Sequence, residues 1–210
     1  MLGVFSRGSL KPLLIGAVLT GASTALDDDV EAYFGPRRRA KWLGDAVDLE
    51  GQPHVLAPLG LALYGAGRLA HSQRFRDATY DIGQAMLVDT LYFAALKKAT
   101  RRRRPDSSNL QSFPSGHTSD AFAWATVAAH YYSWKLSVPA YCVAGLIGVG
   151  RLENSAHHLS DVVAGATLGI IVGRSAVRKD AEPARAARVS LAPARDAYGT
   201  GMGLALHVEF

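Results

Sequence analysis

Cysteine is almost absent from this chain of 210 residues, which contains Cys142 alone. A single cysteine excludes an intramolecular disulfide bond and a zinc site built from several thiolates. Cys142 stands within the apolar run 141–149, a position that predicts an inert buried thiol rather than a nucleophile. The cysteine content therefore leaves the redox state of the compartment open.

Nucleic-acid-binding motifs are also absent, although the formal net charge is +5 at pH 7. The basic residues gather at 37–41, 97–104 and 174–188, and aromatic residues do not alternate with them as a base-stacking surface requires. Such clusters attract anionic lipids or phosphate esters. We expect a phosphate-bearing partner and no nucleic acid.

Long apolar runs are scarce. Shorter apolar segments lie at 10–26, 55–69, 78–96, 121–132, 136–152 and 162–173. Their polar residues recur irregularly rather than at every second position, which favours helices over strands. Most segments are shorter than the ~20 residues that cross a bilayer, so membrane-spanning helices and buried core helices both fit the pattern. The sequence predicts one all-α domain, a six-helix bundle.

The composition changes after Gly173, where charged residues, alanine and proline replace the apolar helical pattern. Further on, apolar residues of the segment 204–210 alternate with other residues at a period of two, which predicts a strand of a terminal β-hairpin. The expected organisation is a helical domain at 1–178, a linker at 179–188 and a small C-terminal β-hairpin at 189–210.

Three short strings combine two imidazoles, a carboxylate and several cations. They read K-x6-R-P at Lys97 and Arg104, P-S-G-H at 114–117, and R-x5-H-x3-D at Arg151, His157 and Asp161. Phosphoryl transfer needs a nucleophile in line with the leaving oxygen, cations around the equatorial oxygens, and an acid for the leaving group. Each string alone is typical of a solvated basic run, a helix start or a surface histidine. The three together indicate a phosphoryl-transfer site.

The two histidines and the aspartate have distinct expected roles. His157 is the expected nucleophile, which would form a phosphohistidine. Asp161 lies four residues later, so on one helix both side chains share a face and the carboxylate would accept the other ring N–H of His157. His117 is the expected general acid, and afterwards the base that activates water.

The phosphate itself needs donors. Pro114 suits the first position of a helix, so the free N–H groups of the following residues would point at an anion. The glycine at 116 lets the backbone approach the phosphate closely. The expected phosphate-binding residues are Lys97, Arg104, Ser115, Gly116 and Arg151. This scheme requires no metal ion and no other cofactor.

The three patterns in this order resemble the type 2 phosphatidic acid phosphatase (PAP2) superfamily, which also holds bacterial acid phosphatases and vanadium haloperoxidases. The resemblance covers residues 81–173 and implies an all-helical bundle in which the eight residues named above converge on one phosphate pocket. One position departs from the pattern. The superfamily usually has serine immediately before the arginine of the third string, and this chain has Gly150 there.

Other polar residues near the strings have simpler expected roles. Residues 101–103, all arginine, are expected to be solvated, and the run 27–29, all aspartate, is expected to be a solvated helix end rather than a metal site.

Two localisations fit the charge pattern. Lys and Arg mark cytoplasmic loops, and with the amino terminus inside, all three strings lie outside. Two outer loops, 37–41 and 97–104, are basic against this rule, and phosphate binding explains the second. Alternatively, residues 13–22 are the apolar part of a signal peptide cleaved near 23–25, which would release a soluble periplasmic protein.

The leading expectation is a metal-independent phosphatase that removes a terminal phosphate from a lipid phosphate or pyrophosphate. It would lie in the cytoplasmic membrane with its active site facing the periplasm or exterior. The alternatives are a soluble exported acid phosphatase acting on small phosphoesters, a vanadate-dependent haloperoxidase, and a non-catalytic lipid-binding protein.

Overall fold

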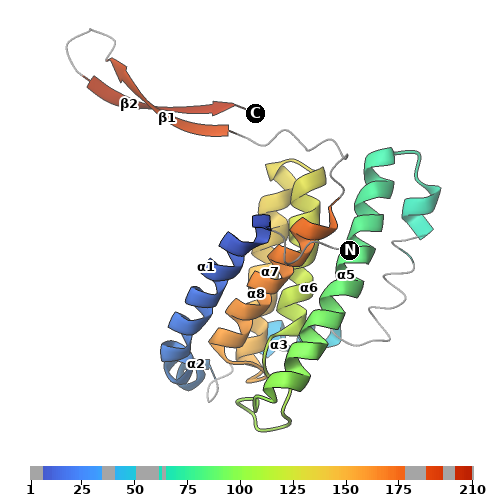
Figure 1. Ribbon diagram of the computed structural model, residues 1–210, viewed down its shortest axis with the longest axis vertical. Helices are drawn as coiled ribbons and strands as arrows, with labels where there is room; N and C mark the ends of the chain where they lie inside the picture. Colours follow the sequence, from blue (N-terminus) through green and yellow to red (C-terminus); the bar gives the residue numbers. More distant parts are fainter. Residues whose placement is uncertain are drawn as a thin grey trace.

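The computed structural model describes residues 7–34, 41–50, 62, 65–177, 188–195 and 202–209. The helices are α1 (Arg7–Ser23), α2 (Asp27–Phe34), α3 (Lys41–Glu50), α5 (Gln73–Thr100), α6 (Gly116–Tyr131), α7 (Trp134–Glu153) and α8 (Leu159–Ala176). A single 3-10 turn, η1 (Thr24–Leu26), joins α1 to α2. Figure 1 shows α1, α5, α6, α7 and α8 running side by side as a bundle.

The fold is helical, as expected, but the expected count of six helices is wrong in its first part. The sequence predicts one helix before residue 50, and the structure has α1, α2 and α3 there. Both additional helices are short and rich in charged residues, so neither contains a long apolar run. The later apolar segments fall within α5, α6, α7 and α8. Most of the segment 55–69 lies outside the described residues.

Helices α6 and α8 pack unusually closely because glycine lines one face of α8 at every fourth position. A Cβ atom would lie 2.4 Å from the Ser115 carbonyl oxygen if added to Gly165, and 2.1 Å from the Ser119 carbonyl oxygen if added to Gly169. Gly173 continues this row against Ala123. Small residues at this spacing let two helix backbones approach. The close contact holds the first turn of α6 against the first turn of α8.

Three helical segments are long and apolar enough to cross a membrane: Ser9–Phe34, Trp134–Glu153 and Leu159–Ala176. The outer faces of α1 and α7 expose large apolar side chains, with Val18 69% and Val143 55% exposed. The prediction of a buried thiol is wrong, because Cys142 is exposed beside Val143 on the outer face of α7. These faces would meet lipid, and the chain is a membrane protein by this criterion.

At the C-terminal end, strands β1 (Arg188–Arg195) and β2 (Met202–Glu209) pair antiparallel. The register places Val189 opposite Val208 and Leu191 opposite Leu206. Of the expected linker 179–188, all but Arg188 lies outside the described residues.

Candidate active site

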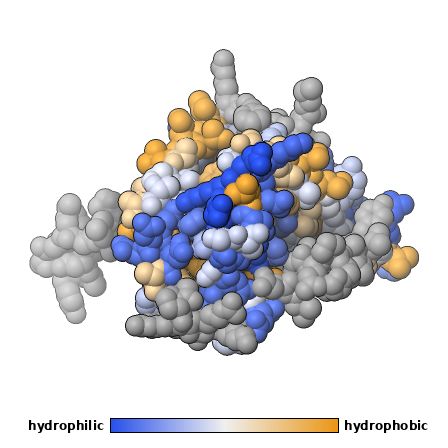
Figure 2. All heavy atoms as spheres, turned by 90° about the horizontal axis from the view of Figure 1, so that it is seen from below, coloured by the Kyte–Doolittle hydropathy of each residue, from blue (hydrophilic) through white to orange (hydrophobic). Residues whose placement is uncertain are grey.

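The three strings meet at one end of the bundle. Helix α5 ends there, the loop 101–115 crosses it, and α6 and α8 begin there (Figure 1). Helix α7 ends at the same place, and the junction of α1 with α2 lies beside it. Figure 2 views the molecule from this end, where hydrophilic residues gather at the centre and apolar residues lie towards the rim. The ends of the helices thus form one polar surface.

His157 lies just before α8, and its side chain is 1% exposed. Its Nδ1 atom is 2.6 Å from the carbonyl oxygen of Ser112. A carbonyl oxygen only accepts hydrogen bonds, so Nδ1 donates and therefore holds the ring proton of the neutral form. The other ring nitrogen, Nε2, then keeps its lone pair. This tautomer is the one that a nucleophilic imidazole needs.

The charge state of His157 follows from its surroundings. Burial holds the pKa of this imidazole well below its usual value, and the positive charges of Lys97, Arg151 and Arg104 lower the pKa further. The hydrogen bond to Ser112 opposes this shift without reversing it. His157 is therefore neutral near pH 7. All three expected cations thus lie close enough to His157 to act on its charge.

Asp161 is fully buried and does not bond His157 as expected. Its Oδ2 atom lies 4.0 Å from His157 Nδ1, beyond hydrogen-bond distance. This carboxylate accepts hydrogen bonds from the Ser112 hydroxyl at 2.5 Å and the His158 backbone N–H at 2.9 Å. The prediction fails because α8 begins at Leu159. His157 precedes the helix, so the two side chains do not share a helical face.

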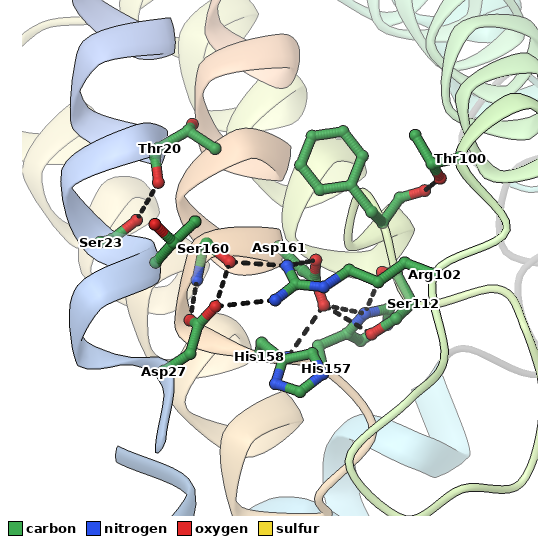
Figure 3. Close-up of polar contacts among 12 residues, drawn as sticks. Thr20, Ser23, Asp27, Thr100, Arg102, Ser112, His157, His158, Ser160 and Asp161 are labelled. Atoms are coloured by element: carbon green, nitrogen blue, oxygen red, sulfur yellow. Dashed lines mark hydrogen bonds and ion pairs between the residues drawn. The ribbon is translucent and has the colours of Figure 1, made fainter. Parts of the chain in front are cut away.

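Arg102 was expected to be solvated, and its guanidinium instead reaches into the site. It donates to Asp161 Oδ1 at 2.7 Å, to the Ser160 hydroxyl at 2.7 Å and to Asp27 Oδ2 at 2.8 Å. Figure 3 shows it between the two carboxylates. The C-cap of α5, Arg101, has a left-handed φ of 48°, where the chain leaves the helix just before Arg102.

Asp27 is buried as well, which corrects the expectation of a solvated run at 27–29. Its carboxylate accepts hydrogen bonds from the Ser160 backbone N–H at 2.8 Å and from the Ser160 hydroxyl at 2.7 Å. Only the first aspartate of the run turns inward, since Asp28 and Asp29 are exposed. Asp27 thus ties the junction of α1 and α2 to the first turn of α8.

The expected clamps come from two helices and a loop. Lys97, in the last turn of α5, donates to the Gln111 carbonyl oxygen at 2.6 Å. Burial, together with the charges of Arg104 and Arg151, lowers the pKa of Lys97 to about 8. Among the described residues, the Arg104 Nε atom has no hydrogen-bond partner. Arg151, in the last turn of α7, is 4% exposed.

The P-S-G-H string begins α6, but two residues later than expected. Ser115 is the N-cap and Gly116 the first helical residue, so Pro114 lies before the helix. The Ser115 N–H donates to the Asp161 carbonyl oxygen at 3.0 Å, and its hydroxyl is 2.9 Å from that of Thr118. Ser115 therefore joins α6 to α8. The backbone N–H groups at the start of the first turn belong to Gly116, His117 and the residue after them.

The glycine that departs from the family pattern has a packing role. A Cβ atom on Gly150 would lie 2.8 Å from Val47 Cγ2 and 3.3 Å from the Leu43 carbonyl oxygen, both on α3. A hydrogen bond also fixes α3: the Asn154 side-chain amide donates to the Gly44 carbonyl oxygen at 2.8 Å. Helix α3 occupies the space that a serine side chain at 150 would need.

The residues that sequence reasoning missed are Ser112, Arg102, Asp27 and Ser160. Ser112 stands two residues before the P-S-G-H string, Arg102 lies in a run of four arginines, and Asp27 is 133 residues from Ser160. Among the described residues, no group of three or more His, Cys, Asp or Glu is placed to hold a metal ion.

Comparison with known proteins gives matches in one family. Residues 80–182 match the model of the PAP2 superfamily. Lipid A 1-phosphatase of Porphyromonas gingivalis is 39% identical over 101 residues, which cover 43% of this chain and 23% of that protein. Phosphatidylglycerophosphatase B of Bacillus subtilis is 29% identical over 182 residues, which cover 76% of this chain and 86% of that one. The chain thus spans about a quarter of the first relative's length and most of the second's.

Two solved structures are similar in fold. The crystal structure of Aquifex aeolicus LpxE matches with a TM-score of 0.54 and 27% identity, covering 63% of this chain and 82% of that one. A transmembrane PAP2 type phosphatidylglycerolphosphate phosphatase from Bacillus subtilis matches with a TM-score of 0.62 and 20% identity, covering 82% of this chain and 98% of that one. The helical arrangement around the site is therefore one already seen in solved proteins.

Proposed function

We propose, because this chain belongs to the PAP2 superfamily, that it hydrolyses a terminal phosphate of a lipid phosphate or pyrophosphate through a phosphohistidine on His157, without a metal ion. The observation that supports this most is the state of His157, which is buried and held with Nδ1 protonated. The positive charges of Lys97, Arg151 and Arg104 lower its pKa further. A neutral imidazole among cations suits attack on an anionic phosphate.

In the first step, Nε2 of His157 attacks phosphorus, and the bond from phosphorus to the leaving oxygen breaks. Lys97, Arg104 and Arg151 hold the equatorial oxygens, and His117 gives its proton to the leaving oxygen. The imidazole becomes positively charged as the new bond forms. The carboxylate of Asp161, 4.0 Å from Nδ1, stabilises this charge through space.

In the second step, a water molecule attacks the phosphohistidine. His117, now neutral, takes a proton from this water, and the bond between phosphorus and Nε2 breaks. Inorganic phosphate leaves, His157 returns to its neutral form, and His117 regains the proton that it lost in the first step. No electron acceptor and no further reactant is consumed.

A lipid substrate agrees with the position of the site. Exposed apolar side chains on α1 and α7 would lie in lipid, while the site lies at the polar end of the bundle. The relatives named above act on lipids by name. The charge pattern of most loops supports an orientation with this end outside the cytoplasm.

The alternative of a cleaved, soluble form agrees less well with the packing of α1. Gly16 lies against Thr167 of α8, where a Cβ atom would be 2.0 Å from the threonine Cγ2. Cleavage near 23–25 would remove this helix from α8 and leave Asp27, which is part of the polar network, at the new terminus. We therefore propose that α1 stays in the membrane as part of the enzyme.

The test is phosphate release by the purified protein in detergent with EDTA present, from a lipid phosphate and from a small soluble phosphomonoester. The wild type is expected to release phosphate faster from the lipid, and His157→Ala to release none. His71→Ala is the matched control, because this histidine is exposed and lies just before α5, whose opposite end contributes to the site. Loss of release with EDTA, or equal release by His157→Ala, would overturn the proposal.

A further inference from the structure

Ser112 connects His157 and Asp161, the two residues that were expected to share a direct hydrogen bond. Its carbonyl oxygen accepts the hydrogen bond from His157 Nδ1, and its hydroxyl donates to Asp161 Oδ2. Its backbone N–H donates to the Arg102 carbonyl oxygen at 3.0 Å. All three polar groups of this buried serine are thus fixed, and the direction of its carbonyl determines where the ring of His157 points.

Arg102 closes this arrangement into a ring of contacts. Its backbone carbonyl holds Ser112, its guanidinium holds Asp161, and the Ser112 hydroxyl connects to the same carboxylate. Moving Arg102 would therefore move both neighbours of His157 together. A lysine cannot replace it, because one ammonium group does not reach two carboxylates in the way that a planar guanidinium does.

Asp27 fixes Arg102 from the other side. Its carboxylate accepts from the guanidinium at 2.8 Å and from two donors of Ser160, so its position is set by α8 as well. Two carboxylates around one guanidinium also leave a net negative charge near His157. Without Asp27, Arg102 would neutralise Asp161 in full, and the cation that forms on His157 would be less stabilised.

Resting on the function proposed above, we propose that Arg102 and Asp27 are positioning residues of the phosphatase reaction. They hold Ser112 and Asp161, and through these the ring of His157, in the orientation that attack on phosphorus needs. Asp27 lies outside the residues 80–182 that match the family model, as the first residue of α2 and within the candidate membrane segment Ser9–Phe34. The first membrane helix therefore completes the active site rather than only anchoring the protein.

The experiment compares Asp27→Asn and Arg102→Lys with two matched controls, Asp28→Asn and Arg103→Lys, whose side chains are exposed. Rates are measured in detergent with the lipid phosphate. We expect kcat to fall by about 10- to 100-fold in the first pair, because a misplacement of about 1 Å at a reacting group can cost a factor of about 100. KM should change less than about twofold, because the phosphate clamps are untouched. The controls should match wild type.

Two further readouts separate positioning from loss of structure. A double variant with both changes should lose no more activity than the worse single variant, because the two residues act as one unit. The acid limb of the pH profile of kcat/KM should move to lower pH in Asp27→Asn, since a negative charge near His157 is lost. A general loss of structure would neither make the effects of the two substitutions non-additive in this way nor shift the acid limb of the pH profile.

The outcomes are distinguishable. No phosphate release by the wild type would end the function proposed above, and this inference with it. A wild type that is active and needs His157, with Asp27→Asn and Arg102→Lys both retaining its kcat, would overturn the positioning role alone. If Arg102→Lys does not fold, Asp27→Asn decides the question, because the amide keeps the size of the carboxylate.

Discussion

The close packing of α6 on α8 should make Gly169 intolerant of even one methyl group. Alanine at 169 would place its Cβ atom 2.1 Å from the Ser119 carbonyl oxygen, a distance at which the backbones must separate. Alanine at Gly145, on α7, meets nothing within 4 Å and serves as the control. Both changes replace a helical glycine by alanine, so the conformational gain of about 0.5–1 kcal/mol is the same for each.

The two variants therefore differ by the cost of overpacking alone. Forcing one extra methyl group into a close contact costs about 1–3 kcal/mol. We expect the free energy of unfolding of Gly169→Ala to be lower than that of Gly145→Ala by this amount. The site should respond too, because the α6–α8 contact holds His117 and Asp161 at adjacent helix starts. A displacement of about 1 Å can cost a factor of about 100 in rate.

The assay is unfolding of both variants in one detergent, followed by tryptophan fluorescence, with the rate of phosphate release measured on the same samples. Gly145→Ala should be at least as stable as wild type and equally active. If Gly169→Ala matches Gly145→Ala in both stability and rate, the helices do not approach as described, and the reasoning from the glycine row is refuted.

Three further predictions concern the site. The acid limb of kcat/KM should lie well below pH 6.5, because activity is lost only as the pH falls through the lowered pKa of His157. Lys97→Met removes a positive charge near this imidazole, so it should raise the pKa of His157 and move the acid limb to higher pH in a pH-rate profile. Above pH 8 the KM of the wild type should rise as Lys97 loses its charge, whereas the KM of Lys97→Arg should stay constant up to pH 9.5. The same dependence of KM on pH in the wild type and in Lys97→Arg would contradict this. Gly150→Ser should lose about 1–3 kcal/mol of stability by displacing Val47, which thermal melting beside Gly145→Ala measures.

Much of the site follows from the sequence because its spacing is local. The strings around Lys97, 114–117 and His157 lie at helix ends, and helices that pack side by side bring such ends together. The rest depends on contacts that no local pattern contains. Arg102 is one of four consecutive arginines, and only the backbone turn at Arg101 distinguishes it. The four-residue spacing also predicted a direct hydrogen bond between His157 and Asp161. That prediction is wrong because the spacing does not reveal that α8 starts after His157.

Helices α2 and α3 show the same limit in the fold. Each is held in place by a few polar or close contacts from distant residues, such as Ser160 on Asp27 and Asn154 on Gly44. A search for long apolar runs misses short helices of this kind, because the contacts that fix them come from residues far along the chain.

The most direct test of His157 as the nucleophile is to trap the phosphoenzyme. The protein is mixed with a lipid phosphate labelled in its phosphate group, quenched in alkali within milliseconds, digested, and mapped by mass spectrometry. We predict an acid-labile phosphate on His157, formed with EDTA present and absent in His157→Ala. Phosphate on another residue, or steady turnover with no labelled protein at any quench time, would contradict it.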